Sequence, residues 1–468
     1  MAQLPCRPRA GRNARRNDET FLPPKALRFF VCTRDRPQAL GLCLDSLSGS
    51  LKEALPGLTA HCYILDDSTT PALSTQVRRL AGASACAPLQ IKIIDRGRQH
   101  AIYQQLAALH PESLRLLKCT CRMLGRGPWD LAGVRNFAFL LAYCYSNEND
   151  IIIFLDDDIL LTSSAYGGHF IEIEGVSLIR QLLSSIRTGQ LIASGTTYFG
   201  RLDGSILDHL RLYFTDLTNG MLSDLRDPEA RAQMIERLQQ ISLFPSTLPA
   251  RIVLPGGRAA LKSGPGISGA LLVTTPAALL SHPLPRCYNE DWIWLSLLGR
   301  PGASIRRVRL KALHAAPPQA PIKSDFVAYQ NTGEVVYRAV RAVMKDAASC
   351  RNALERCWDT ISVDHLLRAK QGLAREIRSL LQAGMKLDKW LDGTGLLSGE
   401  AHLRASVRSA IRGVRRCGKD ALESVEATDY AALYRWFQGY LRGIPKWRRL
   451  LRESREAVGE EVRRHGGC

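Results

Sequence analysis

An apolar run that ends in three adjacent aspartates restricts the fold of this chain more than any other feature of its sequence. The run covers residues 151–155, and Asp156, Asp157 and Asp158 follow it directly. A short, continuous stretch of β-branched and aromatic residues is typical of a strand buried on both faces, as in a parallel sheet. The carboxylates then lie at the carboxyl edge of the sheet, where open α/β folds bind ligands.

Runs of strand length alternate with segments of helical spacing before and around this point. The expected strands cover residues 27–32, 62–65 and 91–94, and the expected helices cover residues 37–47, 101–124 and 131–145. Pro111 interrupts the second of these helices, because proline removes a helical hydrogen bond. Further downstream, residues 267–275 and 305–310 are expected strands and residues 291–298 an expected short helix. Alternation of this kind predicts an α/β fold, with a mostly parallel sheet flanked by helices.

Composition divides the chain into three parts. Residues 1–25 form an Arg-rich polar arm, which no apolar segment of the kind found in signal peptides follows. Residues 26–320 form the predicted α/β domain, which ends at a cluster of prolines, and residues 325–468 are basic and of helical spacing. No apolar run is long enough to span a bilayer, so we expect a soluble, cytoplasmic protein.

The net charge of +19 suits an anionic partner. Nucleic acid, a nucleoside diphosphate, an anionic acceptor and an anionic membrane surface all fit, and so does a solvated basic surface. Zinc-finger spacing and the aromatic signature of RNA-recognition domains are missing, so nucleic acid is not expected. The basic C-terminal helices remain open to acceptor binding, dimerisation, peripheral membrane contact or a plain helical bundle. The thirteen scattered cysteines suit reduced thiols packed as small apolar groups.

Three unneutralised carboxylates at one place repel one another, so a divalent cation is their natural partner. Hard oxygen ligands suit Mg²⁺ or Mn²⁺. A solvated acidic loop is the alternative interpretation. Phosphotransferases with an aspartyl nucleophile also place aspartates after an apolar strand, but they usually continue with Thr or Val two places after the second one. Ile159 and Leu160 follow here, which argues against that class.

Four short motifs occur in a recognisable order along the α/β part. They are Val31-Cys32-Thr33-Arg34-Asp35-Arg36-Pro37, Leu65-Asp66-Asp67-Ser68, Val134-Arg135-Asn136 and Asp156-Asp157-Asp158. Over about residues 27–316, the chain resembles family 2-type glycosyltransferases of the GT-A fold, in the nucleotide-diphospho-sugar transferase superfamily. In that family the first motif belongs to the first strand and helix, the second meets the donor base, the third is an Arg-Asn helix, and the last is the DxD motif that binds the metal.

Two downstream features extend the resemblance. Asn289-Glu290-Asp291-Trp292 matches the Glu-Asp pair from which inverting members draw their catalytic base, and His314 stands where some members place a histidine on the metal. The Gln-x-x-Arg-Trp motif of processive synthases is missing: Arg435-Trp436 is present, but Ala432 occupies the position of the Gln. Synthesis of a polymer is therefore not expected.

The resemblance implies a metal-dependent enzyme that moves a sugar from a nucleotide-diphospho-sugar to an acceptor hydroxyl, with inversion. UDP is the default donor base, and the acceptor stays open. Asp291 is the implied base, and Glu290 is expected to raise its pKa by like-charge repulsion. The implied donor-binding residues are Thr33, Arg34, Asp66, Asp67, Arg135, Asp156 and Asp157. The implied ligands of Mn²⁺ or Mg²⁺ are Asp156, Asp158 and His314.

Each of these residues also has a structural interpretation. Asp66 can cap a helix, Arg135 can form a surface ion pair, and Asp291 can be a favourable acid in a first helical turn. His314 can be structural, and Trp292 and Trp294 suit a sugar ring or a core equally well. The glycine-rich segment 256–269 can close over a diphosphate or simply connect two strands.

Two other functions remain open. A nucleotidyltransferase of similar fold usually has a Gly-rich loop after its first strand, where this chain has residues 33–37. A non-enzymatic protein that binds an acidic partner through its basic surface is the other alternative.

Overall fold

The computed structural model describes residues 26–55, 60–85, 89–109, 111, 131–166, 169–186, 192–196, 198–200, 228–229, 232–233, 236, 269–298, 304–315, 324–348, 361–393 and 401–465. Four predicted features lie outside these residues: the basic arm, residues 256–268 of the glycine-rich segment, the later part of the helix expected at 101–124, and the proline cluster between the two predicted domains.

The α/β part is built on a seven-stranded sheet of order β11-β8-β10-β4-β1-β2-β3. Its strands are β1 (Leu27–Thr33), β2 (Ala60–Asp66), β3 (Leu89–Asp95), β4 (Ile151–Asp156), β8 (Ile192–Gly195), β10 (Leu271–Thr274) and β11 (Ser304–Arg307). Neighbouring strands are parallel except at β10, which runs antiparallel to β4 and β8. The predicted α/β fold with a mostly parallel sheet is confirmed.

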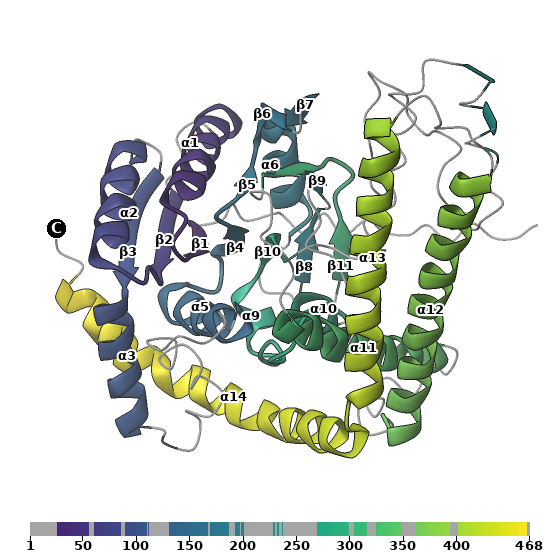
Figure 1. Ribbon diagram of the computed structural model, residues 1–468. Helices are drawn as coiled ribbons and strands as arrows, with labels where there is room; N and C mark the ends of the chain where they lie inside the picture. Colours follow the sequence, from purple (N-terminus) through teal and green to yellow (C-terminus); the bar gives the residue numbers. More distant parts are fainter. Residues whose placement is uncertain are drawn as a thin grey trace, which may run out of the picture.

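Helices cover both faces of this sheet (Figure 1). On one face, α1 (Pro37–Ala54), α2 (Pro71–Ser84) and α6 (Gly175–Ser184) share a core with Leu27, Phe29 and Val31 of β1. On the other face, α3 (Arg96–Leu109), α5 (Leu131–Tyr145), α9 (Pro276–Leu279) and α10 (Glu290–Leu298) pack with Phe30 and Cys32 of the same strand. Successive side chains of a strand point to opposite faces, so a sheet covered twice requires continuous apolar strands.

Two small sheets lie beside the main one. A three-stranded sheet contains β5 (Ile159–Leu160), β12 (Ala312–His314) and β9 (Tyr198–Gly200), and a hairpin joins β6 (Thr162–Tyr166) to β7 (His169–Glu174). In the antiparallel pair β5–β12, His314 lies opposite Ile159. The amide of Ala315 donates to the carbonyl of Asp158 at 2.8 Å, which fixes β12 beside the three aspartates.

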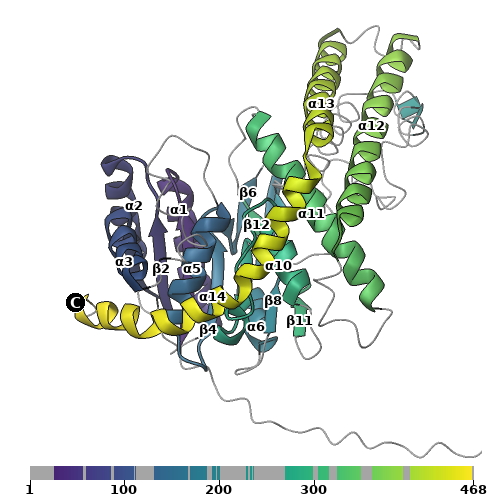
Figure 2. The ribbon, with the colours of Figure 1, turned by 90° about the horizontal axis from the view of Figure 1, so that it is seen from below.

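Every described element after residue 324 is a helix: α11 (Ser324–Ala348), α12 (Val363–Gly393), α13 (Ala401–Ala427) and α14 (Tyr430–His465). The predicted helical extension is confirmed, and α12 and α13 project away from the sheet (Figures 1 and 2). These four helices enclose a core of their own, which includes Ile293 and Leu297 of α10. Within the described residues, no helix combines the length and apolar character needed to cross a membrane.

Helix α10 lies between two cores. Ile293 and Leu297 face the C-terminal helices, whereas Trp294, Leu295 and Leu298 belong to the core beneath the sheet. A helix that is apolar on all sides is buried on all sides. Trp294 is therefore a core residue, and its Nε1 donates to the carbonyl of His282 at 3.0 Å.

The last helix returns to cover the α/β part. Figure 1 shows α14 passing beneath α5 and reaching α3. Trp447, Leu450 and Leu451 are buried in the core on that face of the sheet. The Nε1 of Trp447 donates to the carbonyl of Leu279 at 2.9 Å, and Arg455 donates to the carbonyl of Ser146 at 2.8 Å. The C-terminal helices are thus attached at both their first and their last element.

Replacing Trp447 with Ala is expected to lower the free energy of unfolding by about 3–5 kcal/mol, because it leaves a large cavity under α14. It also leaves the Leu279 carbonyl without its donor. Urea denaturation measures the change. Lys446→Ala is the matched control, since Lys446 is exposed on the same helix and a surface substitution changes stability by less than about 0.5 kcal/mol. Equal effects of the two variants would contradict the packing described here.

Candidate active site

The carboxyl ends of β1, β2 and β4 meet at one edge of the main sheet. Register places Thr33 of β1 beside Asp66 of β2, and Cys32 beside Asp156 of β4. Parallel strands in register end together, so the polar residues that follow each strand gather at the same edge. Asp157 and Asp158 continue directly from β4 at this place.

Arg36 neutralises two of the three aspartates. Its Nη2 lies 2.5 Å from Oδ1 of Asp157, and its Nη1 donates to Oδ2 of Asp158 at 2.7 Å. Asp157 is fully buried and also accepts a hydrogen bond from Oγ1 of Thr33 at 2.6 Å. Burial raises the pKa of Asp157 to about 7. Thr33 and Arg36 thus hold Asp157 in the interior, and of the three aspartates only Asp156 is partly exposed.

Arg36 is not among the predicted site residues. A signal was present, because Arg36 stands between the end of β1 and Pro37, the first residue of α1. A residue between the end of a parallel strand and the next helix lies at the carboxyl edge of the sheet. Its partners lie more than one hundred residues away, at Asp157 and Asp158, and no local pattern connects them.

His314 lies beside Asp158. Its Nε2 is 3.2 Å from Oδ1 of Asp158, and both side chains are buried. Burial alone would raise the pKa of Asp158, but the neighbouring His314 and Arg36 lower it below the ordinary value. A carboxylate and an imidazole at this distance are a donor set that suits Mn²⁺ or other divalent transition ions. Oδ1 of Asp158 and Nε2 of His314 therefore face the same point, where both could contact one cation.

Asp156 points toward Arg135 instead. Nη2 of Arg135 donates to both oxygens of Asp156, at 2.6 and 2.8 Å, and the Asp156 side chain is 27% exposed. Of the three predicted metal ligands, the structure thus brings Asp158 and His314 together and holds Asp156 on Arg135. Within the described ranges, no group of three or more His, Cys, Asp or Glu side chains is arranged to hold a metal.

Arg135 connects Asp156 to Glu290, the residue that precedes the predicted base. It lies in the second turn of α5, and its Nη1 donates to Oε1 of Glu290 at 2.6 Å. Burial alone would lower the pKa of Arg135, but Asp156 and Glu290 raise it well above the ordinary value. The next residue, Asn136, exchanges two hydrogen bonds with the backbone of Leu284, at 2.9 and 2.6 Å. Arg135 is therefore a buried connection and not a surface ion pair.

An Arg135→Ala variant is expected to lose about 3–5 kcal/mol of unfolding free energy, because it leaves the buried Glu290 carboxylate without its cation. Denaturation in urea tests this. Arg78→Ala is the control, since Arg78 and Asp95 form an exposed ion pair, with Arg78 56% exposed, and such pairs contribute about 0–1 kcal/mol. A loss from Arg135→Ala no larger than that from Arg78→Ala would exclude the buried connection.

Glu290 and Asp291 begin α10 and have different environments. Glu290 is buried, and burial, followed by the charge of Asp291, raises its pKa to about 7. Asp291 is only partly buried. Its Oδ2 accepts from the amide of Gly269 at 2.6 Å and its Oδ1 from the amide of Trp292 at 2.8 Å. A Cβ at Gly269 would lie 2.7 Å from Cβ of Asp291, so this approach requires glycine.

The pKa of Asp291 is raised, as expected, but for another reason. Burial is the main cause, and Arg135 acts in the opposite direction. The expectation that repulsion from Glu290 raises it is corrected: Glu290 is already paired with Arg135. Asp291 retains accessible surface, whereas Glu290 is enclosed.

The remaining predicted donor-binding residues lie along the same edge. Asp66 is buried and accepts hydrogen bonds from the amide and hydroxyl of Ser68 and from the hydroxyl of Ser74, at 3.0, 2.5 and 2.6 Å. It thus caps the turn that leads into α2. Asp67 is also buried, and its amide donates to the carbonyl of Thr33 at 2.9 Å. Nε of Arg34 lies 3.9 Å from Asp35.

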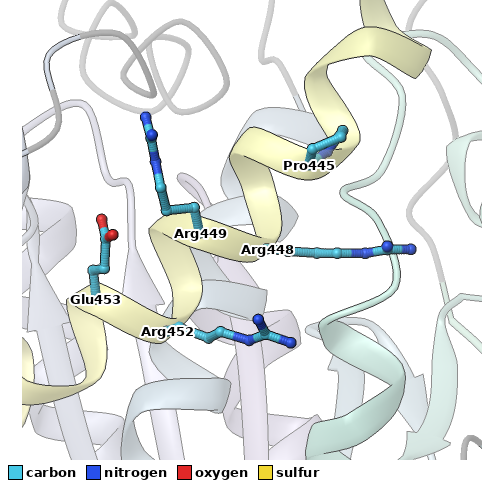
Figure 3. A pocket seen from close by; sticks show the side chains of 5 residues that line it. All are labelled: Pro445, Arg448, Arg449, Arg452 and Glu453. Carbon is cyan, nitrogen blue, oxygen red and sulfur yellow. The ribbon is translucent and has the colours of Figure 1, made fainter.

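A pocket of about 450 Å³ lies against α14 and shares no residue with this site. It is lined by Pro445, Arg448, Arg449, Arg452 and Glu453 (Figure 3). Nε of Arg448 donates to the carbonyls of Leu280 and Ser281, at 3.2 and 3.1 Å, so this arginine has a structural task.

No protein-family model matches this chain, and no curated protein matches it. Among solved structures, a mannosyltransferase from Pyrobaculum calidifontis in complex with GDP-Man and Mn²⁺ aligns over 83% of this chain and 86% of its own, with 12% identity and a TM-score of 0.38. Mannosyl-3-phosphoglycerate synthase from Rubrobacter xylanophilus aligns over 69% and 75%, with 13% identity and a TM-score of 0.31. Mouse xyloside xylosyltransferase 1 aligns over 58% and 72%, with 10% identity and a TM-score of 0.27. All three TM-scores lie below 0.5, so these structures support no statement about the substrate or activity of this chain.

Proposed function

We propose that this chain is a glycosyltransferase that moves a sugar from a nucleotide-diphospho-sugar to an acceptor hydroxyl, with inversion. The observation that carries the proposal is the link from Asp156 through Arg135 to Glu290, which joins the aspartates after β4 to the carboxylates that begin α10. Residues from four motifs, quoted above in their order along the chain, meet at the edge where α/β folds bind ligands.

In this proposal Asp158 and His314 hold a divalent cation, Mn²⁺ or Mg²⁺, with Asp156 as the third predicted ligand. The cation supplies positive charge to the leaving nucleoside diphosphate. The protein contributes Arg36 and Arg135, whose two guanidinium groups offset two of the three negative charges of the aspartates. Thr33 and Asp157 fix Arg36 at the floor of the site.

Asp291 is the proposed base. As the bond from the anomeric carbon to the diphosphate oxygen breaks, its electron pair leaves with the nucleoside diphosphate. A bond forms from the acceptor oxygen to the same carbon, and the acceptor proton passes to Asp291. Raising the pKa of Asp291 makes this carboxylate a stronger proton acceptor. Glu290, held by Arg135, keeps its neighbour in place.

The proposal is tested by the melting temperature of the purified protein with UDP-glucose, GDP-mannose and ADP-glucose, each with and without Mn²⁺. A ligand that binds only the folded state stabilises it and so raises the melting temperature. At a ligand concentration one hundred times the Kd, the added free energy of unfolding is about 2.7 kcal/mol. We expect a Mn²⁺-dependent shift with one nucleotide sugar, together with release of its nucleoside diphosphate. A well-folded protein with no shift for any of them would remove the donor site and favour the basic binding protein.

A further inference from the structure

The C-terminal helix α11 contacts the segment that carries the proposed base. Asn289 directly precedes Glu290 and has a φ of 61°, in the left-handed region that asparagine tolerates better than most residues. Its carbonyl accepts the amide of Ile293 at 2.9 Å, in the first turn of α10. The conformation of Asn289 therefore sets the direction in which α10, with Asp291 at its start, leaves the preceding chain.

Glu334 of α11 holds the Asn289 side chain. Nδ2 of Asn289 donates to Oε2 of Glu334 at 2.8 Å, and both residues are buried. Next to this bond, α11 touches the backbone itself: a Cβ at Gly333 would lie 2.0 Å from the carbonyl oxygen of Tyr288. Contact this close leaves the Tyr288–Asn289 backbone no room to shift toward α11.

Glu334 is itself fixed by a second pair of charges. Its Oε1 accepts from Nε of Arg338 at 2.7 Å, one turn along α11. The two terminal nitrogens of Arg338 donate to the two oxygens of Glu376 on α12, at 2.7 and 3.1 Å. A guanidinium held in this way at both ends has little rotational freedom, which makes it a rigid support for Glu334.

We propose that Glu334 is a positioning residue: through Asn289 it orients the start of α10, and thereby Asp291, for proton transfer. The inference rests on the proposed function and assigns the C-terminal helices a part in it. The donor site lies at the carboxyl edge of the sheet and the base at the start of α10. Because α10 packs into both cores, the C-terminal helices can fix the position of Asp291 without contacting the donor.

Asn289→Gly and Glu334→Gln test this inference. Glycine keeps the left-handed backbone at no steric cost and removes only the hydrogen bond to Glu334. Glutamine keeps one acceptor oxygen and cannot serve both Asn289 and Arg338. We expect either variant to lower kcat for nucleoside diphosphate release, with water as acceptor, by up to about 100-fold, the cost of misplacing a reacting group by about 1 Å. The donor KM and the donor-induced shift in melting temperature are expected to stay as in the wild type.

Two further measurements separate positioning from loss of structure. The double variant is expected to lose no more kcat than the larger single loss, because both changes break one connection. Hydrogen exchange is expected to rise in a peptide that covers residues 288–294 and to stay unchanged over β1. Arg378→Gln is the matched control, since Arg378 forms an exposed ion pair with Glu426 between α12 and α13; it is expected to change none of these values.

Unchanged kcat in Asn289→Gly, or additive losses in the double variant, would overturn the inference. So would a parallel loss of donor affinity, because a general loosening of the site affects both substrates. A wild-type protein with neither a donor-induced shift nor nucleoside diphosphate release would instead contradict the proposed function itself. Wild-type activity that survives Asn289→Gly would contradict positioning alone.

Discussion

Asp291→Asn is expected to lower kcat for transfer by about 10²- to 10⁴-fold, the range that general-base catalysis contributes. The amide has nearly the shape of the carboxylate, and its oxygen can still accept the amide proton of Gly269. It cannot take the proton of an acceptor hydroxyl. The donor-induced shift in melting temperature is expected to persist, because the proposed donor contacts lie at the aspartates after β4 and at Arg135.

The same base has a pH signature. An aspartate must be ionised to accept a proton, so kcat/KM falls as the pH drops through its pKa. Burial raises the pKa of Asp291 above the ordinary 3.8. The acid limb of the kcat/KM profile is therefore expected at a higher pH than an exposed aspartate would give. It is expected to disappear in Asp291→Asn. A variant that retains more than about one tenth of the wild-type rate would exclude Asp291 as the base.

Asp158→Ala is expected to have the second large effect. This change removes the carboxylate that faces both His314 and Arg36. We expect the Mn²⁺-dependent part of the melting shift to vanish and nucleoside diphosphate release to fall at least about 100-fold, since loss of an outer-shell partner alone costs 10- to 100-fold. Titration of Mn²⁺ against wild type and variant, read by melting temperature and by rate, measures both.

Asp95→Asn is the matched control for Asp158→Ala. Asp95 ends β3 at the same edge of the sheet, opposite Asp66, and is exposed beside Arg78. Its replacement is expected to leave the Mn²⁺ response intact. A Mn²⁺ response that survives in Asp158→Ala, or that is lost equally in Asp95→Asn, would show that other residues hold the metal. Neither outcome bears on the proposed role of Asp291, which the Asp291→Asn variant tests separately.

Most of the α/β part could be predicted from local pattern, with small errors at the ends of elements. The helix expected at residues 37–47 continues to Ala54, because Leu51 and Ala54 extend its buried face. The strand expected at 305–310 ends at Arg307, and the chain then turns so that Thr196 donates to the carbonyl of Leu310. Neither difference moves a site residue. The metal ligands, the donor base and cytoplasmic location stay predictions.

The sequence by itself determined that Asp156, Asp157 and Asp158 lie at the carboxyl edge of a covered sheet. A continuous apolar strand is stable only where both faces of the sheet are covered. The residues that directly follow such a strand therefore lie at the carboxyl edge of the sheet. It also determined that Glu290 and Asp291 begin a helix, because first-turn acids precede an apolar segment there.

Only the tertiary structure decided how these groups are paired. Arg36 reaches Asp158 across 122 positions of the chain, Arg135 reaches Glu290 across 155, and Asn289 reaches Glu334 across 45. Such pairs have no periodicity and no fixed spacing in the sequence, so no short segment of the sequence predicts them. The return of α14 onto α5 and the place of α10 between two cores have the same origin, since each depends on which buried faces meet when the whole chain packs.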